Sequence, residues 1–180
     1  EDAIPAPVQI ISQDIVQYPD TTNRDTDAIV KFKIKDDGAN ENYYRLNTWA
    51  ERFYQYVDQN GDTVTSDQGE ALRPEMLTAL SDTVRDNGWF VLFSDKNFNG
   101  QEKEIQVKFR NQPYAAGFSK LYIWVELYTV SKTNFLYQQT LEHYRLTNSN
   151  TEPVHVYSNV QNGYGIFTGA DFQRMQFVVK

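Results

Sequence analysis

With 180 residues the chain can bury one hydrophobic core, and its length favours a single domain spanning residues 1–180. It contains no cysteine, which excludes disulfides, thiolate metal sites and a cysteine nucleophile. A net charge of −7 argues against nucleic-acid binding, and no run of about 18 apolar residues predicts a membrane-spanning helix.

The first half of the chain alternates between extended segments and polar turns. Residues 8–16 predict a first strand, and a second is predicted at 28–35, where apolar residues alternate with three lysines. Residues 43–57 predict a long aromatic strand. Because its apolar positions do not keep one parity, we expect a bend or bulge within it.

The middle of the chain contains one predicted short helix and one predicted hairpin. Leu72, Met76, Leu77 and Leu80 have helix-like spacing within 70–84, and Pro74 is tolerable in a first turn. Residues 89–94 form a compact apolar run, and 104–109 alternate cleanly between polar and apolar residues. With the turn at 95–100 between them, these two segments predict a hairpin.

The second half contains the strongest strand and the strongest helix. In residues 121–130, aliphatic side chains alternate with Tyr122, Trp124, Glu126 and Tyr128. Residues 132–147 then predict an amphipathic helix, with Tyr137, Leu141 and Tyr144 on one stripe and Ser131 or Thr133 as N-cap. A final strand is predicted at 172–179. About seven strands separated by turns predict a mainly β fold, an antiparallel β-sandwich of immunoglobulin or fibronectin type with one inserted helix.

The aromatic face of 121–130 is the first candidate binding site. Tyr122, Trp124 and Tyr128 need a cover, and the helix that follows directly is the simplest one. We therefore expect Trp124 to be buried under the 132–147 helix, with Glu126 near an edge where water or a basic group satisfies it. In the alternative, the row is exposed and serves as a sugar-stacking or receptor-docking patch.

Two polar turns imitate calcium-binding loops. Asp58, Asn60 and Asp62 place oxygen ligands at positions 1, 3 and 5, and Asp95, Asn97 and Asn99 match the same spacing before Gly100. An EF-hand also needs a glutamate at position 12, which is Gly69 in the first loop and Gln106 in the second. These residues are also ordinary turn formers, so we expect no bound metal.

The supply of catalytic groups is small. The chain has two histidines, His143 and His155, and neither has a serine or aspartate partner that sequence spacing would place beside it. No nucleophile motif is visible. We therefore expect a protein that is not an enzyme and that has no cofactor.

The closing stretch, residues 152–170, combines a helix-stopping proline with turn chemistry. Pro153 ends the preceding element, and Asn162-Gly163 tolerates positive φ. We expect the glycines to allow close backbone packing, with the aromatics Tyr164 and Phe167 as plugs. The residues proposed as this structural signature are Pro153, Asn159, Gly163, Gly165 and Phe167.

This stretch also carries a family resemblance. Pro153-Val154, Ser158-Asn159-Val160 and the run from Asn162 to Phe167 resemble the closing signature of a Bacteroidetes family, domain of unknown function forty-two forty-nine. Support comes from three further runs: Asn42–Leu46, Phe93–Asp95 and Phe98–Gly100. The resemblance implies an outer-membrane lipoprotein encoded beside a TonB-dependent receptor.

From this resemblance we expect the chain to be the C-terminal half of a longer lipoprotein, lipid-anchored through a segment that is not in this chain. It would lie on the surface or periplasmic face and assist the receptor in nutrient uptake, by association or by ligand capture. The alternative, motivated by the tyrosine and tryptophan content, is a carbohydrate-binding accessory domain of a larger glycan-processing protein.

Overall fold

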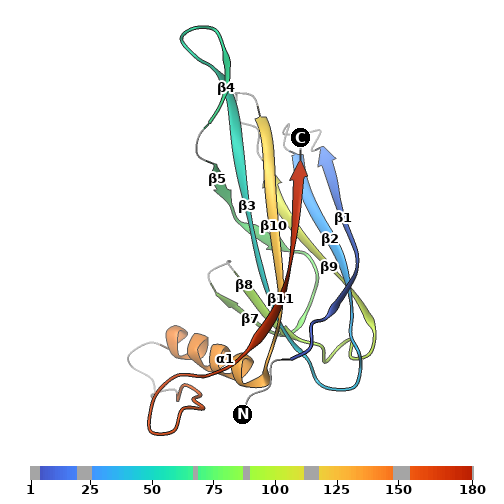
Figure 1. Cartoon of the computed structure of the whole chain (residues 1–180), viewed down its shortest axis with the longest axis vertical. Helices are drawn as coiled ribbons and strands as arrows, with labels where there is room; N and C mark the ends of the chain where they lie inside the picture. The colour runs from blue at the N-terminus through green and yellow to red at the C-terminus, as the bar shows by residue number, and fades with distance from the viewer. Residues whose placement is uncertain are drawn as a thin grey trace.

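The computed structural model describes residues 5–19, 26–66, 69–86, 90–111, 118–147 and 155–179. It contains two antiparallel sheets that pack face to face, with one helix at one end (Figure 1). The first sheet has the order β1-β2-β9-β6, with β1 at Gln9–Pro19, β2 at Thr26–Lys35, β9 at Glu102–Asn111 and β6 at Pro74–Met76.

The second sheet has the order β11-β10-β3-β8-β7. Its strands are β11 (Ala170–Val179), β10 (Phe118–Val130), β3 (Tyr43–Val57), β8 (Phe90–Ser94) and β7 (Ser81–Asp86). Two short strands, β4 (Thr63–Thr65) and β5 (Glu70–Leu72), also pair with β3. The antiparallel β-sandwich with one helix is therefore confirmed.

The core lies between the sheets and follows the two-residue period of the strands. On β10, Leu121, Ile123, Val125 and Leu127 are all buried, and β2 and β9 contribute their own alternating rows from the facing sheet. The lysines between the buried residues of β2 point outward. Each core strand thus has a second face that points away from the facing sheet. What covers that second face determines where a site can form.

The helix α1, Lys132–Leu146, begins immediately after β10. Ser131 is its N-cap, because the Ser131 side chain accepts a hydrogen bond from the Asn134 backbone N–H. The predicted stripe of Tyr137, Leu141 and Tyr144 is not the most buried one. Phe135 is buried instead, against Tyr43 at a ring-centroid distance of 4.7 Å, in a second small core at the end of the sheet.

The helix predicted at 70–84 is wrong, since this segment forms β5, β6 and the start of β7. Exposure alternates strictly along 71–80, with the even-numbered residues half-buried. Leu72, Met76 and Leu80 are four residues apart, a spacing that fits both a helix and a strand. Pairing of β5 with β3 and of β6 with β9 decides between the two, and that information is not local.

The hairpin predicted from 89–94 and 104–109 is also wrong. Both strands exist, but β8 pairs with β3 and β7, whereas β9 pairs with β2 and β6 in the facing sheet. The turn at 95–100 therefore carries the chain from one sheet to the other. Trp89 lies outside the described residues.

The predicted bend within 43–57 has a different explanation. The pairing of β3 with β10 runs without interruption from Tyr43 to Phe53, and the one irregularity lies between Phe118 and Lys120 of β10. Tyr44 is buried between the sheets, while Tyr43 is buried on the opposite face under α1. Apolar residues therefore occur at both odd and even positions because both faces of this regular strand are buried.

Replacing Phe135 with alanine tests how firmly α1 holds the end of the sheet. Because Phe135 is buried against Tyr43, the cavity should lower the free energy of unfolding by about 3–5 kcal/mol. Urea denaturation measures the loss. Tyr144→Ala, on the exposed side of the same helix, should change stability by no more than about 0.5 kcal/mol. Equal effects of the two substitutions would contradict the packing.

Candidate functional site

In the part of the chain that the structure describes, helix α1 covers one end of the outward-facing side of the seven-stranded sheet, called here the outer face. Its central side chains come from alternate positions of β3 and β10 and are Arg45, Asn47, Trp49, Phe53, Tyr122, Trp124, Glu126 and Tyr128. Helix α1 lies across the end nearest Tyr43 and Val130 (Figure 1).

Four aromatic side chains form a continuous row across this face. Trp49 stacks on Trp124 with ring centroids 5.7 Å apart and planes 13° apart, and Trp124 stacks on Tyr122 at 5.9 Å. Tyr122 then meets the ring of Phe53 edge-on at 5.6 Å. The rings cover one another's faces, so the row presents mainly ring edges outward.

Trp124 is therefore half-buried by its neighbours in the row, and the prediction that it lies under α1 is wrong. The helix does cover this face of the sheet. However, Trp124 is six residues from Val130, which corresponds to about 20 Å along a strand. Because α1 starts at Lys132 and packs across the strand ends, against β7 and β3, it does not extend to Trp124.

A polar network lies beside the aromatic row. The buried carboxylate of Glu126 accepts hydrogen bonds from Arg174, from the Tyr128 hydroxyl at 2.9 Å and from the Asn47 side chain at 3.4 Å. Burial raises the pKa of Glu126, but these hydrogen bonds outweigh burial and hold the pKa below its usual value. Arg174 is thus the basic partner that the sequence predicted for Glu126 without identifying it.

Arg45 occupies the boundary between this network and the helix-covered end. Its guanidinium carbon lies 4.4 Å from the centre of the Phe90 ring and 5.8 Å from that of Tyr128, and its Nε donates to Asn47 Oδ1 at 2.9 Å. A depression of about 250 Å³ opens here, lined by Arg45, Asn47, Thr48, Trp49 and Phe90. It is called here the Arg45 pocket.

The closing stretch forms a loop, 155–169, whose shape is fixed by its own hydrogen bonds. The Asn159 side chain donates to the Phe167 carbonyl and accepts from the Phe167 N–H, both at 2.8 Å. The Ser158 hydroxyl donates to the Gly165 carbonyl at 2.8 Å. Gly165 has φ +112°, which only glycine adopts without strain. Pro153 lies outside the described residues.

The aromatic residues of this loop are not plugs, which corrects the sequence expectation. Tyr164 is 103% exposed and Phe167 is 87% exposed, relative to an extended reference. A side chain added at Gly165 would meet nothing within 4 Å, and one at Gly163 would meet only Val160 of the same loop. The glycines therefore shape a turn and do not admit a neighbouring element. The loop displays two aromatic side chains on a fixed backbone.

Asp36 directly follows β2 and holds two turns together at the end of the sandwich. Its carboxylate accepts hydrogen bonds from the Tyr44 hydroxyl (2.7 Å), the Asn42 side chain (2.9 Å) and the backbone N–H groups of Gly38 (2.9 Å) and Gly100 (2.7 Å). Burial raises the pKa of Asp36, but the four hydrogen bonds outweigh it, so the pKa lies below its usual value. Burial and the nearby charge of Asp36 raise the pKa of Asp95.

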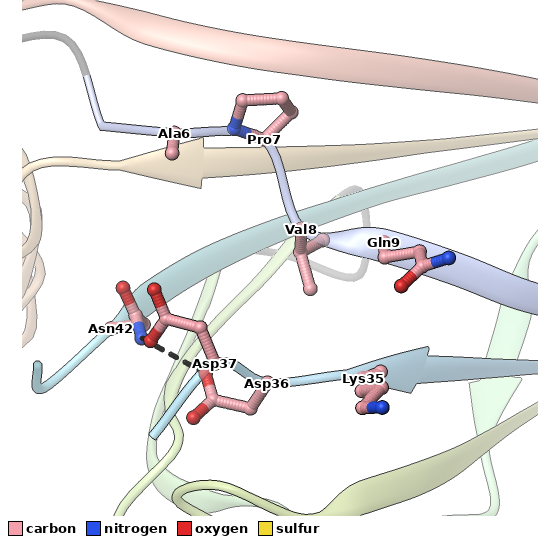
Figure 2. A pocket seen from close by; sticks show the side chains of 8 residues that line it. All are labelled: Ala6, Pro7, Val8, Gln9, Lys35, Asp36, Asp37 and Asn42. Atoms are coloured by element: carbon pink, nitrogen blue, oxygen red, sulfur yellow. Dashed lines mark hydrogen bonds between the residues drawn. The ribbon is translucent and has the colours of Figure 1, made fainter. Parts of the chain in front are cut away.

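A depression of about 220 Å³ lies beside Asp36. Figure 2 shows residues 6–9 along one side of it, with Lys35, Asp36, Asp37 and Asn42 along the other. Each oxygen of Asp36 already accepts two hydrogen bonds, which fills its capacity. We therefore assign Asp36 a structural role and do not take this depression as the ligand site.

The two calcium-like loops place their oxygens differently from a metal site. Asp95 is buried and accepts from the Asn42 backbone N–H at 2.8 Å, while Asn97 and Asn99 are exposed. Asp58 accepts from the backbone N–H groups of Asn60 and Asp62, both at 2.9 Å, as in an ordinary turn. Among the residues the structure describes, no three histidine, aspartate or glutamate side chains gather as metal ligands.

Sequence reasoning found part of this site. It named Tyr122, Trp124 and Tyr128, and the structure joins the first two to Trp49 and places the third against Phe172 at 5.1 Å. Trp49, Arg45 and Asn47 were not predicted. All three are odd-numbered residues of β3, and this spacing alone would have placed them on one face of the strand. His143 lies on α1 and His155 in the loop 155–169, so neither belongs to β3 or β10, and both are exposed.

One comparison with known proteins identifies a family over nearly the whole chain. The sequence model of the family described as a domain of unknown function, DUF4249, matches residues 1–176. No curated protein matches the chain. In the part that the structure describes, no helix has both the length and the apolar character that a membrane crossing requires.

The buried Asp36 carboxylate predicts a specific pH dependence. Because its folded pKa is lowered, its contribution is complete above the unfolded value of about 3.9 and is lost as pH falls through the folded pKa. At pH 7, Asp36→Asn should cost about 2–4 kcal/mol, since the new amide cannot accept all four hydrogen bonds. The difference from the wild type should shrink below about pH 4, as measured by urea denaturation.

The exposed neighbour Asp37 provides the matched control. Asp37→Asn should change stability by no more than about 0.5 kcal/mol at either pH. A cost of Asp36→Asn that stayed constant between neutral and acidic pH would show that the charge of Asp36 is not what holds the two turns.

Chelation tests the metal expectation directly. If Asp58 and Asp95 serve only the turns described above, adding EDTA should leave the melting temperature unchanged. Differential scanning calorimetry with and without EDTA measures this. A lower melting temperature that calcium restores would reverse the assignment of one of the two loops.

Proposed function

The chain belongs to the DUF4249 family, and from that premise we propose that it is a non-enzymatic module that assists a TonB-dependent outer-membrane receptor in nutrient uptake. It would belong to an outer-membrane lipoprotein, on the surface or periplasmic face, and would act by association with the receptor and by ligand capture. The receptor and the compartment rest on the family resemblance, and the docking surface rests on the loop 155–169.

The observation that carries the proposal is the full exposure of Tyr164 and Phe167 on a loop with a fixed shape. An exposed aromatic side chain on a flexible segment is common, but here four side-chain hydrogen bonds of Ser158 and Asn159 hold the backbone: Ser158 donates to Gly165 and accepts from Val160, and Asn159 bonds Phe167 twice. A loop whose backbone is already fixed loses little entropy on binding, and exposed aromatic residues supply much of the energy of protein interfaces.

The loop also has the charge pattern of an interface. Residues 155–169 contain no lysine, arginine, aspartate or glutamate, although 23% of the chain is charged. Depletion of charge around exposed aromatic residues is typical of the centre of protein–protein interfaces. The loop is fastened to α1 at both ends, by the Tyr157 N–H to Thr140 Oγ1 bond (2.9 Å) and by the Ser131–Thr168 hydroxyl contact (2.7 Å).

The alternative, a carbohydrate-binding accessory domain, draws on the aromatic row of the outer face. Sugar rings bind aromatic side chains by lying flat on an open ring face. In the row, Trp49, Trp124 and Tyr122 cover one another's faces at interplanar angles of 13° and 21°. This stacking occupies a ring face of each of the three residues, and the side of Trp49 away from Trp124 borders only the small Arg45 pocket. The row therefore offers no broad platform for a chain of sugars, which favours association with a protein.

Binding to the receptor encoded beside the gene tests the proposal. The double substitution Tyr164→Ser, Phe167→Ser should weaken binding at least about tenfold, because two exposed interface anchors are removed. The melting temperature should not change, since neither ring contacts the core. Surface plasmon resonance with the detergent-solubilised receptor measures affinity.

Tyr56→Ser is the matched control, because Tyr56 is also an exposed aromatic residue but lies at the far end of β3, next to β4 (Figure 1). It should bind the receptor as the wild type does. Unchanged binding of the loop variant, or equal losses in both variants, would contradict docking through 155–169.

A further inference from the structure

We propose that the Arg45 pocket is a binding site for a small organic anion in which a carboxylate is attached to a planar apolar group. The inference rests on the ligand-capture part of the proposed function and does not involve the loop 155–169. It follows from three properties of the pocket: a cation held in one orientation, a net positive charge nearby, and two aromatic side chains, Trp49 and Phe90, in its lining.

The Arg45 guanidinium is oriented before any ligand arrives. It lies over Phe90 and faces Tyr128, and Asn47 accepts the hydrogen bond from its Nε. These contacts use one of its five N–H donors. Among the carboxylate side chains that the structure describes, none lies within ion-pair distance of Arg45. Its remaining donors form the planar fork that matches a carboxylate.

The carboxylate of the neighbouring polar network does not serve Arg45. Glu126 is occupied by Arg174, Tyr128 and Asn47, and its lowered pKa keeps it ionised for them. Arg45 and Arg174 together with Glu126 carry a net charge of +1 (two positive charges and one negative). In a chain with a net charge of −7, this site favours one negative charge.

The walls of the pocket select a planar apolar group. In the sheet, β10 lies on one side of β3 and β8 on the other. Trp49 therefore has Trp124 on its β10 side and the pocket, with Phe90, on its β8 side. At about 250 Å³ the pocket is below the usual range of about 300–1,000 Å³ for drug-sized ligands, so it suits one ring system and not an oligosaccharide.

Calorimetric titration of the isolated chain with 2-naphthoate and with its neutral analogue 2-naphthamide tests the proposal. Naphthoate should bind saturably, and naphthamide should bind at least about tenfold more weakly, because it lacks the charge that strengthens hydrogen bonds to Arg45. This comparison uses only the wild-type protein, so it does not depend on the folding of a variant.

Arg45→Gln should weaken naphthoate at least about tenfold and leave naphthamide unchanged. Arg110→Gln, the same exchange at an exposed position of β9 in the other sheet, should change neither. Saturation-transfer NMR should show the naphthalene protons in contact with the protein. Melting curves of both variants check the fold.

Four results would overturn the proposal: no saturable binding of naphthoate, equal binding of naphthamide, unchanged binding in Arg45→Gln, or displacement of naphthoate by equimolar inorganic phosphate. The first three remove the site or the role of its charge, and the last would show an anion site with no preference for a planar group. None of these results involves the receptor, so failure here leaves the test of the loop 155–169 unaffected.

Discussion

The buried carboxylate of Asp36 is the interaction on which the two-sheet arrangement depends most directly. The chain crosses from the first sheet to the second through residues 36–42 and returns through 95–101. Asp36 accepts donors from both crossings, including Gly38 in one and Gly100 in the other. Both glycines have φ +71°, and a Cβ on Gly38 would come within 2.7 Å of the Gly100 Cα. Two glycine turns therefore pack back to back around one ionised group.

This arrangement explains both what the sequence could predict and what it could not. Alternation within 28–35 and 121–130 is a local property, and it predicted β2 and β10 correctly because one face of each strand is buried. Partner choice is not local. The same turn residues, Asp95 to Gly100, are compatible with a hairpin or with a crossing between sheets. The crossing is held by bonds between residues far apart in the chain, such as those from Gly100 to Asp36 and from Asn42 to Asp95.

The candidate site was less predictable than the fold, for a related reason. The face of β10 that carries Tyr122 and Trp124 can be derived from the two-residue period, but its cover depends on the direction that α1 takes. A helix that begins one residue after the strand has a choice of directions, and Phe135 against Tyr43 fixes it across the strand ends. The sequence therefore predicted the correct face of the sheet for α1, but it wrongly extended the helix over Trp124.

The position of the Arg45 pocket follows from where that cover stops. Phe90 belongs to the small core beneath α1, together with Phe135, and also forms a wall of the pocket. Phe90 thus shields one side of the Arg45 guanidinium from water, while Trp49 marks the start of the aromatic row. An ion pair is weak in full solvent and costly in a sealed core, and a half-covered boundary avoids both limits. Thr140 of the same helix and its N-cap Ser131 fasten the loop 155–169, so α1 supports one proposed binding surface directly and the other through the core that Phe135 shares with Phe90.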